Sequence, residues 1–419
     1  MEDARTSRAA CALATPPTEG GPMTQTTSRA DADRAPEPER PTADLPAPLR
    51  RLRDFGRPPR VMGIDVARGV AVIGMIGAHV GMTAPFEWER IETWTALVHG
   101  RSSLLFALVA GISIALLSGG SRRPDVADLP RLRLSLVGRG AVVFAIGCAL
   151  ELVGTGIAII LTIYGVLFVA IIPFLRMRVR SLWIAAGAFA LLGPVSLACV
   201  RLLSPDVYGE GIALVFGPYP VTAWMPLLLA GMAIGRTDLL RVRTGVALLL
   251  GGAAVTTAGY GIGTLLAGPA EALTAAGANP SPMLERLAAL GIPLRPLWAL
   301  IEVAPHSGAT LEIVGSGGLA AAIVGLCLLL ARPLRWLLLP LAALGSMPLT
   351  AYSAQIVAIA ASGGLAAAEA REGAMWPLLT VVLLVATTAW MVLLGTGPLE
   401  RVTRAASAWM AGAAGVRRS

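Results

Sequence analysis

Ten apolar segments follow one another between residues 61 and 396, and most of them are close to the length that a helix needs to cross a bilayer. A spanning helix requires about 20 predominantly apolar residues. The segments cover residues 61–83, 101–118, 134–153, 155–175, 181–200, 218–235, 244–267, 310–331, 336–361 and 375–396. Only 14% of the residues are charged, against about 25% in soluble domains. We therefore predict an all-α, polytopic membrane helix bundle with about ten transmembrane helices.

Composition divides the chain into three regions. Residues 1–60 are rich in Pro, Ala, Arg, Thr and acidic residues and lack periodic apolar positions, which predicts a disordered cytoplasmic tail without a signal peptide. Residues 61–405 form the predicted transmembrane domain, and residues 406–419 form a short basic cytoplasmic tail. The stretch that begins at Pro333 leaves three alternatives open: a tilted helix, a helix broken at Pro348, or two separate helices.

The arginines between the apolar segments predict the orientation of the bundle. All 34 basic residues are arginine. If the N-terminal segment is cytoplasmic, 21 arginines flank or lie in cytoplasmic loops, and six lie in outer loops. Because basic loops remain on the cytoplasmic side, this asymmetry predicts that both termini are cytoplasmic. The arginines are scattered between apolar runs, so we expect no nucleic-acid partner.

The sequence lacks several common motifs for disulfides, metal ions, nucleotides and catalytic nucleophiles. The four cysteines form no CxxC pair and lie at no metal-ligand spacing from a histidine, so we expect neither a disulfide nor a metal site. The chain has no Walker loop, GxGxxG unit, HExxH motif or serine nucleophile elbow. We therefore expect no tightly bound cofactor.

The first apolar segment contains three ionisable residues: Asp65, Arg68 and His79. A charge at the bilayer centre costs about 2.5–3.5 kcal/mol, and such residues usually face a bundle interior or a watery cavity. Arg68 and His79 are 11 positions apart, which places them on one stripe of a helix about 16 Å apart. Asp65 is one turn before Arg68 and can pair with it. The pattern predicts a polar path; the alternative is a self-satisfied Asp–Arg pair with a hydrogen-bonded histidine.

The remaining candidates lie near the ends of other segments. His99 precedes the second segment and His306 lies in the sequence PHSG, so all three histidines are predicted on the outer side. Arg139 and Arg101 are candidate ligands for anions, and Arg139 can equally reach the cytoplasmic surface. Glu151 and Glu312 can orient a histidine, or simply lie in water at helix ends. As the catalytic base we rank His79 first, then His306, then His99.

Three segments resemble the catalytic domain of the heparan-alpha-glucosaminide N-acetyltransferase family: GIDVARGVAVIGMIGAHV, HGRSSLLFALVAGISIAL and YPVTAWMPLLLAGMAIGR. The sequences SMPLTAYSAQ and GPLERVTR are similar to the C-terminal end of related bacterial inner-membrane proteins. The resemblance covers about residues 60–405. It departs from the family in two places. No histidine precedes Trp94 in FEWERIETWTALVHG, where the family has its catalytic histidine, and His99 follows instead. Near the start of the second segment, where the family has an aspartate, this sequence has Gly100 and Arg101.

The resemblance implies an acyltransferase of a bacterial cytoplasmic membrane. Acetyl-CoA or another acyl-CoA is the implied cosubstrate, approaching from the cytoplasm, and an extracytoplasmic amine or hydroxyl is the acceptor. The spacing of Arg68 and His79 is also similar to an arginine–histidine signature of broader membrane acyltransferase families, which implies that His79 is the base or acyl carrier. Arg68, Arg139 and Arg101 are then the ligand-binding candidates, supported by Asp65, Glu151 and Glu312. We expect the lipid bilayer as a partner and allow a homo-oligomer.

Two other functions are compatible with the same residues. A multispan transporter of a small molecule also has buried ionisable groups and helices interrupted by proline or glycine. Against a transporter, the DVARG segment has no counterpart in the second half of the chain. A structural or sensory membrane protein would use the charges only to pack its helices.

Overall fold

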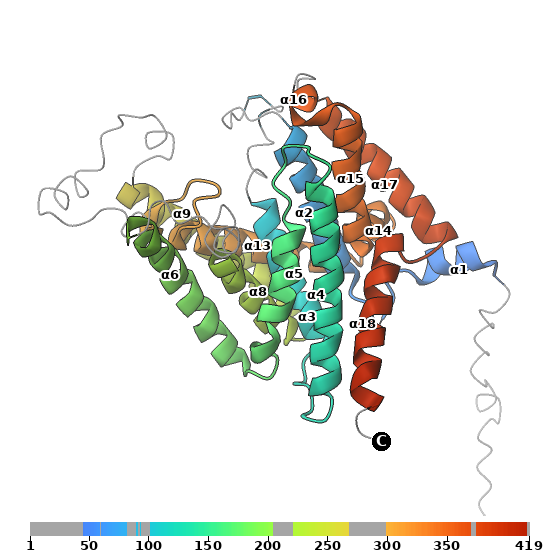
Figure 1. The fold of residues 1–419 in the computed structure, drawn as a ribbon, viewed down its shortest axis with the longest axis horizontal. Coiled ribbons are helices and arrows are strands. Elements are labelled where there is room, and N and C mark those ends of the chain that lie inside the picture. Colours follow the sequence, from blue (N-terminus) through green and yellow to red (C-terminus); the bar gives the residue numbers. More distant parts are fainter. Residues whose placement is uncertain are drawn as a thin grey trace, which may run out of the picture. The chain divides into compact units, whose positions relative to one another are not determined.

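The computed structural model describes residues 45–58, 60–81, 89–90, 93, 101–203, 221–267, 299–369 and 374–416. The chain divides into the units Met1–Leu45 and Pro46–Ser419, and every helix described below belongs to the second unit. The described residues form helices and turns and contain no strand, which confirms the predicted all-α class. Figure 1 shows these helices in chain order.

Each of the ten predicted segments contains helical structure. Six helices are long and apolar enough to cross a membrane: α2 (Met62–Val80), α4 (Leu129–Glu151), α6 (Val179–Leu203), α9 (Val242–Ala267), α13 (Thr310–Leu330) and α17 (Met375–Leu393). A seventh span results if the bent pair α14 (Leu339–Ser346) and α15 (Pro348–Ala361) counts as one. The other apolar helices are shorter: α3 (Ser102–Leu117), α5 (Leu161–Ala170) with the 3-10 turn η3 (Ile172–Phe174), and α8 (Val221–Gly235). By length and composition the described residues thus support six or seven spans, and ten stays a prediction.

The shorter helices α3 and α8 pack against each other inside the bundle. Every residue of α8 from Ala223 to Gly235 is buried. A Cβ atom added at Gly111 would lie 2.0 Å from the carbonyl oxygen of Leu228, and one added at Gly231 would lie 2.0 Å from that of Leu108. These glycines therefore let the two backbones touch, as small residues do in membrane helix pairs.

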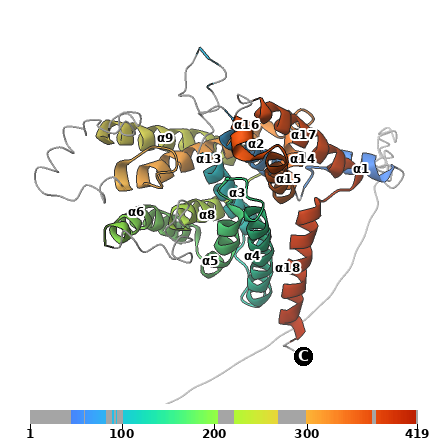
Figure 2. The same cartoon turned by 45° about the horizontal axis from the view of Figure 1, so that its top comes forward.

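Longer helices surround this centre and expose apolar side chains. Helix α13 packs against α9, and α14 packs against α2, so the bundle extends to both sides of α2 (Figure 2). On α17, Leu378, Val381 and Val385 lie on one face and are each more than half exposed. An outward apolar face of this kind suits contact with lipid acyl chains.

Two described helices fall in regions for which the sequence predicted tails. Helix α1 (Ala47–Asp54) lies within the predicted tail 1–60 and contacts α17. Helix α18 (Pro398–Val416) extends into the predicted tail 406–419 and packs along α4 (Figure 1). Both are amphipathic and have low overall hydrophobicity, so a search for apolar spans does not detect them.

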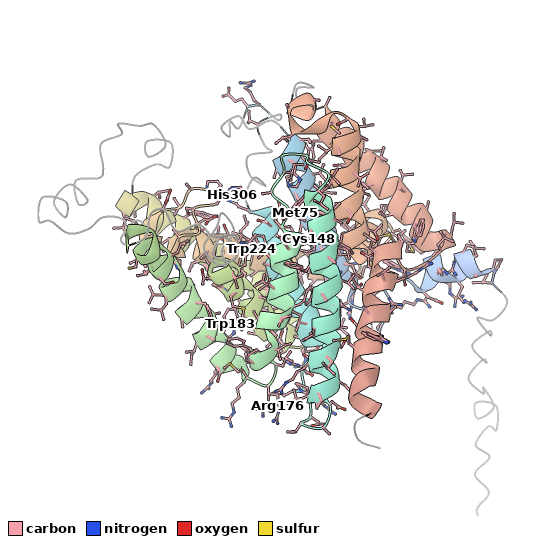
Figure 3. The ribbon with its side chains drawn as sticks, viewed as in Figure 1. Met75, Cys148, Arg176, Trp183, Trp224 and His306 are labelled. Atoms are coloured by element: carbon pink, nitrogen blue, oxygen red, sulfur yellow. The ribbon has the colours of Figure 1, made fainter. Side chains whose placement is uncertain are left out.

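The ends of the bundle differ in the residues that they carry. Figure 3 shows Arg176, which the sequence predicts on the cytoplasmic side, and His306, predicted on the outer side, at opposite ends of the helices. This placement agrees with the predicted alternation of loops. Which end faces the cytoplasm stays a prediction.

Candidate functional site

A cavity of about 590 Å³ lies between α2, α3, α4, α5, α15 and α18. Part of its wall comes from α1 and from the turn after α17. The charged residues of the wall are Arg51, Arg60, Arg68, Arg139, Arg404, Asp65 and Glu400. With five arginines and two carboxylates, the wall favours an anionic ligand.

Arg68 and Asp65 pair in this wall, as their spacing on α2 predicts. Nη1 of Arg68 is 2.9 Å from Oδ1 of Asp65, and Nε of Arg60 is 2.5 Å from the other carboxylate oxygen. Nη1 of Arg68 also donates to the carbonyl oxygen of Gly345 at 2.7 Å, and Nη2 donates to Oγ of Ser113 at 2.7 Å. Arg68 is therefore held in one orientation by three helices.

Arg139 of α4 contrasts with Arg68. Its guanidinium lies 5.9 Å from the centre of the Phe168 ring, a cation–π contact. Within the described ranges no hydrogen bond or ion pair involves its guanidinium. Its five N–H donors are thus available to a ligand in the cavity.

Glu400 of α18 fixes the start of α15. Its Oε1 accepts hydrogen bonds from the backbone N–H groups of Leu349 at 2.8 Å and Thr350 at 3.1 Å, and its Oε2 accepts from Oγ1 of Thr350 at 2.6 Å. A carboxylate at this position satisfies unpaired N–H groups and the positive end of the helix dipole. Glu400 thereby stabilises the break between α14 and α15, where the helix axis turns by 87°.

Two tyrosines, Tyr164 and Tyr352, also line the cavity. The ring of Tyr164 packs edge-on between Phe106 and Trp224, at 5.2 and 5.3 Å between ring centres. Tyr352 of α15 is 2% exposed, and its hydroxyl accepts a hydrogen bond from the backbone N–H of Ile160 at 3.4 Å. Neither tyrosine was a candidate from the sequence; the only signal was a tyrosine within an apolar run.

His79 contacts the ring of Tyr352. The two ring centres are 6.4 Å apart and the ring planes meet at 72°, an edge-on contact. His79 is half-buried and does not itself line the cavity, whereas Arg68 does. The cavity therefore reaches Arg68 and Tyr352 but not His79, and the polar path from Arg68 to His79 stays a prediction.

The other predicted histidines are not part of the cavity wall. His306 is exposed, in a turn with φ of 67°, and its backbone N–H donates to Oε1 of Glu312 at 3.0 Å. Glu312 is buried and also accepts from the N–H of Gly308 at 2.7 Å and from Oγ of Ser307 at 3.3 Å. In these contacts Glu312 binds two backbone N–H groups and one hydroxyl of the loop, and the contact to His306 is to its backbone. His99 lies outside the described residues.

Arg101 and Glu151 also lie away from the cavity. The guanidinium of Arg101 stacks on the ring of Tyr260 and donates from Nε to its hydroxyl at 3.1 Å, and that hydroxyl is 2.6 Å from Oγ of Ser316. Glu151 is exposed and accepts a hydrogen bond from Thr162 at 3.4 Å. Both side chains join neighbouring segments in the structure.

Arg236, which the sequence assigned only to a cytoplasmic loop, is buried directly after α8. It donates to the carbonyl oxygens of Ser118, Gly120, Arg122 and Leu175 at 2.7–3.1 Å. Burial lowers the pKa of its guanidinium below the ordinary value. Its role in the structure is to hold the loop after α3. Among the described residues, no group of three or more His, Cys, Asp or Glu side chains is arranged to hold a metal ion.

Comparison with known families agrees with the resemblance. Residues 60–249 match the family model described as Heparan-alpha-glucosaminide N-acetyltransferase, catalytic. This segment is similar to the catalytic domain of that family and makes up less than half of the chain. It contains α2, α3, α4 and α5, which form one side of the cavity, while α15 and α18 follow it in the chain. No curated protein and no solved structure matched the chain.

Proposed function

We propose that this protein is a membrane-embedded acyltransferase that transfers an acetyl group from cytoplasmic acetyl-CoA to an extracytoplasmic amine or hydroxyl. The family match supports acetyl transfer, and the observation that carries the proposal is the arginine-lined cavity, one side of which the matched segment forms. The acceptor is an amino sugar or another envelope component.

The arginines of the cavity suit the phosphates of coenzyme A. Arginine binds phosphate through two parallel charge-assisted hydrogen bonds. Arg139 has its donors available, and among the described residues the guanidinium of Arg404 donates only to Oγ1 of Thr396, at 3.4 Å. Arg68 is held by Asp65 and Gly345 and presents a fixed positive charge. In this arrangement the phosphates lie near the arginines, and the acyl group extends toward Tyr164 and Tyr352.

His79 is the proposed general base. The acceptor nitrogen or oxygen attacks the thioester carbonyl carbon, so that a C–N or C–O bond forms while the C–S bond breaks. The imidazole takes the proton that the acceptor loses and returns it to the sulfur of the departing thiolate. A histidine has an unperturbed pKa near 6.5, which suits both transfers at neutral pH.

Acetyl-CoA binding and acetyl transfer test this proposal on the purified full chain in lipid nanodiscs. We expect millimolar acetyl-CoA to raise the melting temperature, because a ligand that binds only the folded state stabilises it. We also expect release of free thiol and labelled N-acetylglucosamine when glucosamine is the acceptor probe. Absence of both a melting shift and thiol release with any amine or alcohol probe would rule the function out.

A transporter is the second candidate, because one observation favours it. The pair α14 and α15 is a broken helix whose second half begins at the cavity, and transporters commonly build substrate sites at such breaks. A transporter predicts uptake of a labelled solute into proteoliposomes that contain no acyl-CoA. An acetyltransferase predicts that acetylated product appears only when acetyl-CoA is supplied on the side of the arginine cavity.

A further inference from the structure

Helix α1 is fixed to the bundle by two arginines, although none of its own residues is buried. Arg51 donates from Nη1 to the carbonyl oxygen of Leu393, the last residue of α17. Arg335, in the turn between α13 and α14, donates from Nη2 to the carbonyl oxygen of Phe55 at 2.9 Å, directly after α1. In each bond a cation binds a carbonyl group that a helix end leaves unpaired. Helix α1 therefore lies beside the end of α17 and beside this turn (Figure 1).

Together these segments form a basic surface, defined here as residues 47–57 and 331–338. They contain six arginines and one aspartate. Arg50, Arg57 and Arg332 are exposed. Within the described ranges, only Arg57 of these three bonds to a carboxylate, that of an aspartate in α1 at 3.4 Å. A single carboxylate cannot neutralise six guanidinium groups, so the surface attracts anions.

Apolar side chains are exposed among these arginines. Trp336 is 61% exposed and Leu337 is 74% exposed, and the guanidinium of Arg335 lies 4.7 Å from the centre of the Trp336 ring. Leu49 of α1 is also exposed. The candidate spans α13 and α17 both end beside this surface. Tryptophan and arginine at the ends of spans are typical of the level of the lipid headgroups. The surface thus combines groups that suit acyl chains with groups that suit phosphates.

We propose that the basic surface binds the headgroup phosphate of an anionic phospholipid, while Trp336 and Leu337 enter the boundary of the acyl chains. This inference goes beyond the proposed acetyl transfer and does not depend on it. Arginine binds phosphate through paired charge-assisted hydrogen bonds, and clusters of basic residues beside a membrane helix attract anionic lipids. Charge complementarity favours an anionic headgroup over that of phosphatidylcholine, which has no net charge.

Native mass spectrometry of the purified full chain in detergent micelles tests this proposal, with phosphatidylglycerol as the anionic probe and phosphatidylcholine as the neutral one. The test variant combines Arg50→Gln, Arg57→Gln and Arg332→Gln. The matched control removes three exposed arginines from another segment, by Arg176→Gln, Arg178→Gln and Arg180→Gln. Three arginines near an anionic surface contribute about 100-fold in affinity, and less as salt screens them.

We expect the test variant to bind phosphatidylglycerol at least about tenfold more weakly than wild type, and the control variant to stay within about threefold. Wild type should bind phosphatidylglycerol more tightly than phosphatidylcholine. Both variants should melt near the wild-type temperature without added lipid, because exposed substitutions change stability little. Arg51 and Arg335 are left in place, so α1 keeps its bonds to the bundle.

Quenching of Trp336 by brominated lipids locates the contact without these arginine substitutions. The difference in fluorescence between wild type and Trp336→Phe isolates one tryptophan among the nine of the chain. In phosphatidylcholine nanodiscs with a minor fraction of brominated lipid, brominated phosphatidylglycerol should quench this emission at least about twofold more than brominated phosphatidylcholine, because the anionic lipid is enriched beside the arginines. High salt should reduce the difference.

Three results would overturn the proposed lipid site. Unchanged affinity in the test variant means that phosphatidylglycerol binds elsewhere, for example in the arginine cavity. An equal loss in the control variant means that general surface charge attracts the lipid. Equal quenching by the two brominated lipids means that Trp336 has no preferred anionic neighbour. None of these measurements uses acetyl-CoA, so failure of the proposed acetyl transfer and failure of the lipid site are separate outcomes.

Discussion

At the scale of single residues, substitution of Arg139 tests most directly whether the cavity binds an anionic ligand. Its guanidinium contacts Phe168 and has neither a hydrogen bond nor an ion pair within the described ranges. We expect Arg139→Gln to raise KM for acetyl-CoA by at least tenfold, because hydrogen bonds to charged groups contribute about 1.5–3 kcal/mol. Melting curves should show that the variant without ligand is as stable as wild type.

Arg176→Gln is the control for this substitution. Arg176 is exposed at the end of the bundle and does not line the cavity (Figure 3). A KM that rises equally in both variants would mean that general surface charge attracts the donor, and that Arg139 does not bind it.

His79 allows a second prediction at this scale. His79→Gln keeps a polar side chain beside Tyr352 but removes the imidazole that would accept the proton. We expect kcat to fall by about 100-fold or more, within the range of about 10²–10⁴ for general bases. The melting shift with acetyl-CoA should persist, because the arginines remain. Substantial activity in His79→Gln would transfer the search for the base to His306 and His99.

The residues of the site differ in how far the sequence determines them. Asp65 and Arg68 are three positions apart on one helix, so spacing alone predicts their ion pair. The bond from Arg68 to Gly345 joins positions 277 residues apart, and the bonds from Glu400 to α15 span about 50. Contacts of this kind depend on helix packing. Periodicity and spacing therefore identified Arg68 but not Glu400, Tyr164 or Tyr352.

At the scale of helices, the crossing of α2 and α14 sets the position of Arg68. A Cβ atom added at Gly345 would lie 1.8 Å from the carbonyl oxygen of Asp65 and 2.5 Å from the backbone nitrogen of Gly69. We expect Gly345→Ala to separate the helices and to lower stability by about 1–3 kcal/mol, the usual cost of overpacking. Thermal unfolding in nanodiscs measures this, and KM for acetyl-CoA should rise because Arg68 loses its carbonyl partner.

Gly251→Ala on α9 is the matched control. No atom lies within 4 Å of a Cβ atom added at that position, and the residue is exposed. Because alanine favours helix more than glycine by about 1 kcal/mol, this variant should be as stable as wild type or slightly more stable. Equal destabilisation in the two variants would show that close packing at Gly345 is not the cause.

Apolar runs predicted where the long membrane helices lie, but not the helix break at Pro348, the lengths of the shorter helices or the amphipathic helices. The stretch from Pro333 left three alternatives open, and the structure contains the break at Pro348. Helices α3, α5 and α8 are shorter than the apolar runs suggest, and α3 and α8 pack against other helices in the interior. Helices α1 and α18 were not predicted, because neither is a continuous apolar run. Helix α18 packs on α4, whereas α1 has no buried residue and contacts α17, where Arg51 donates to the carbonyl oxygen of Leu393.

At the scale of the whole molecule, the orientation in the membrane decides whether the cavity can meet a cytoplasmic donor. The 21 arginines on one side and six on the other predict that the end with Arg176 is cytoplasmic. A chain whose four native cysteines are replaced by alanine allows a direct test. We expect a membrane-impermeant maleimide to label Pro305→Cys in intact cells and to label Arg176→Cys only after the membrane is opened.

Both test positions are exposed, so a difference in labelling reports the side of the membrane and not burial. The reversed pattern would place the arginine cavity on the outer side, where acyl-CoA is absent, and would contradict the proposed direction of transfer. Labelling of both positions in intact cells would contradict the separation of the two ends by the bilayer. The predicted pattern is the one in which Arg139 faces the donor pool and His79, 11 positions beyond Arg68 on α2, lies toward the acceptor.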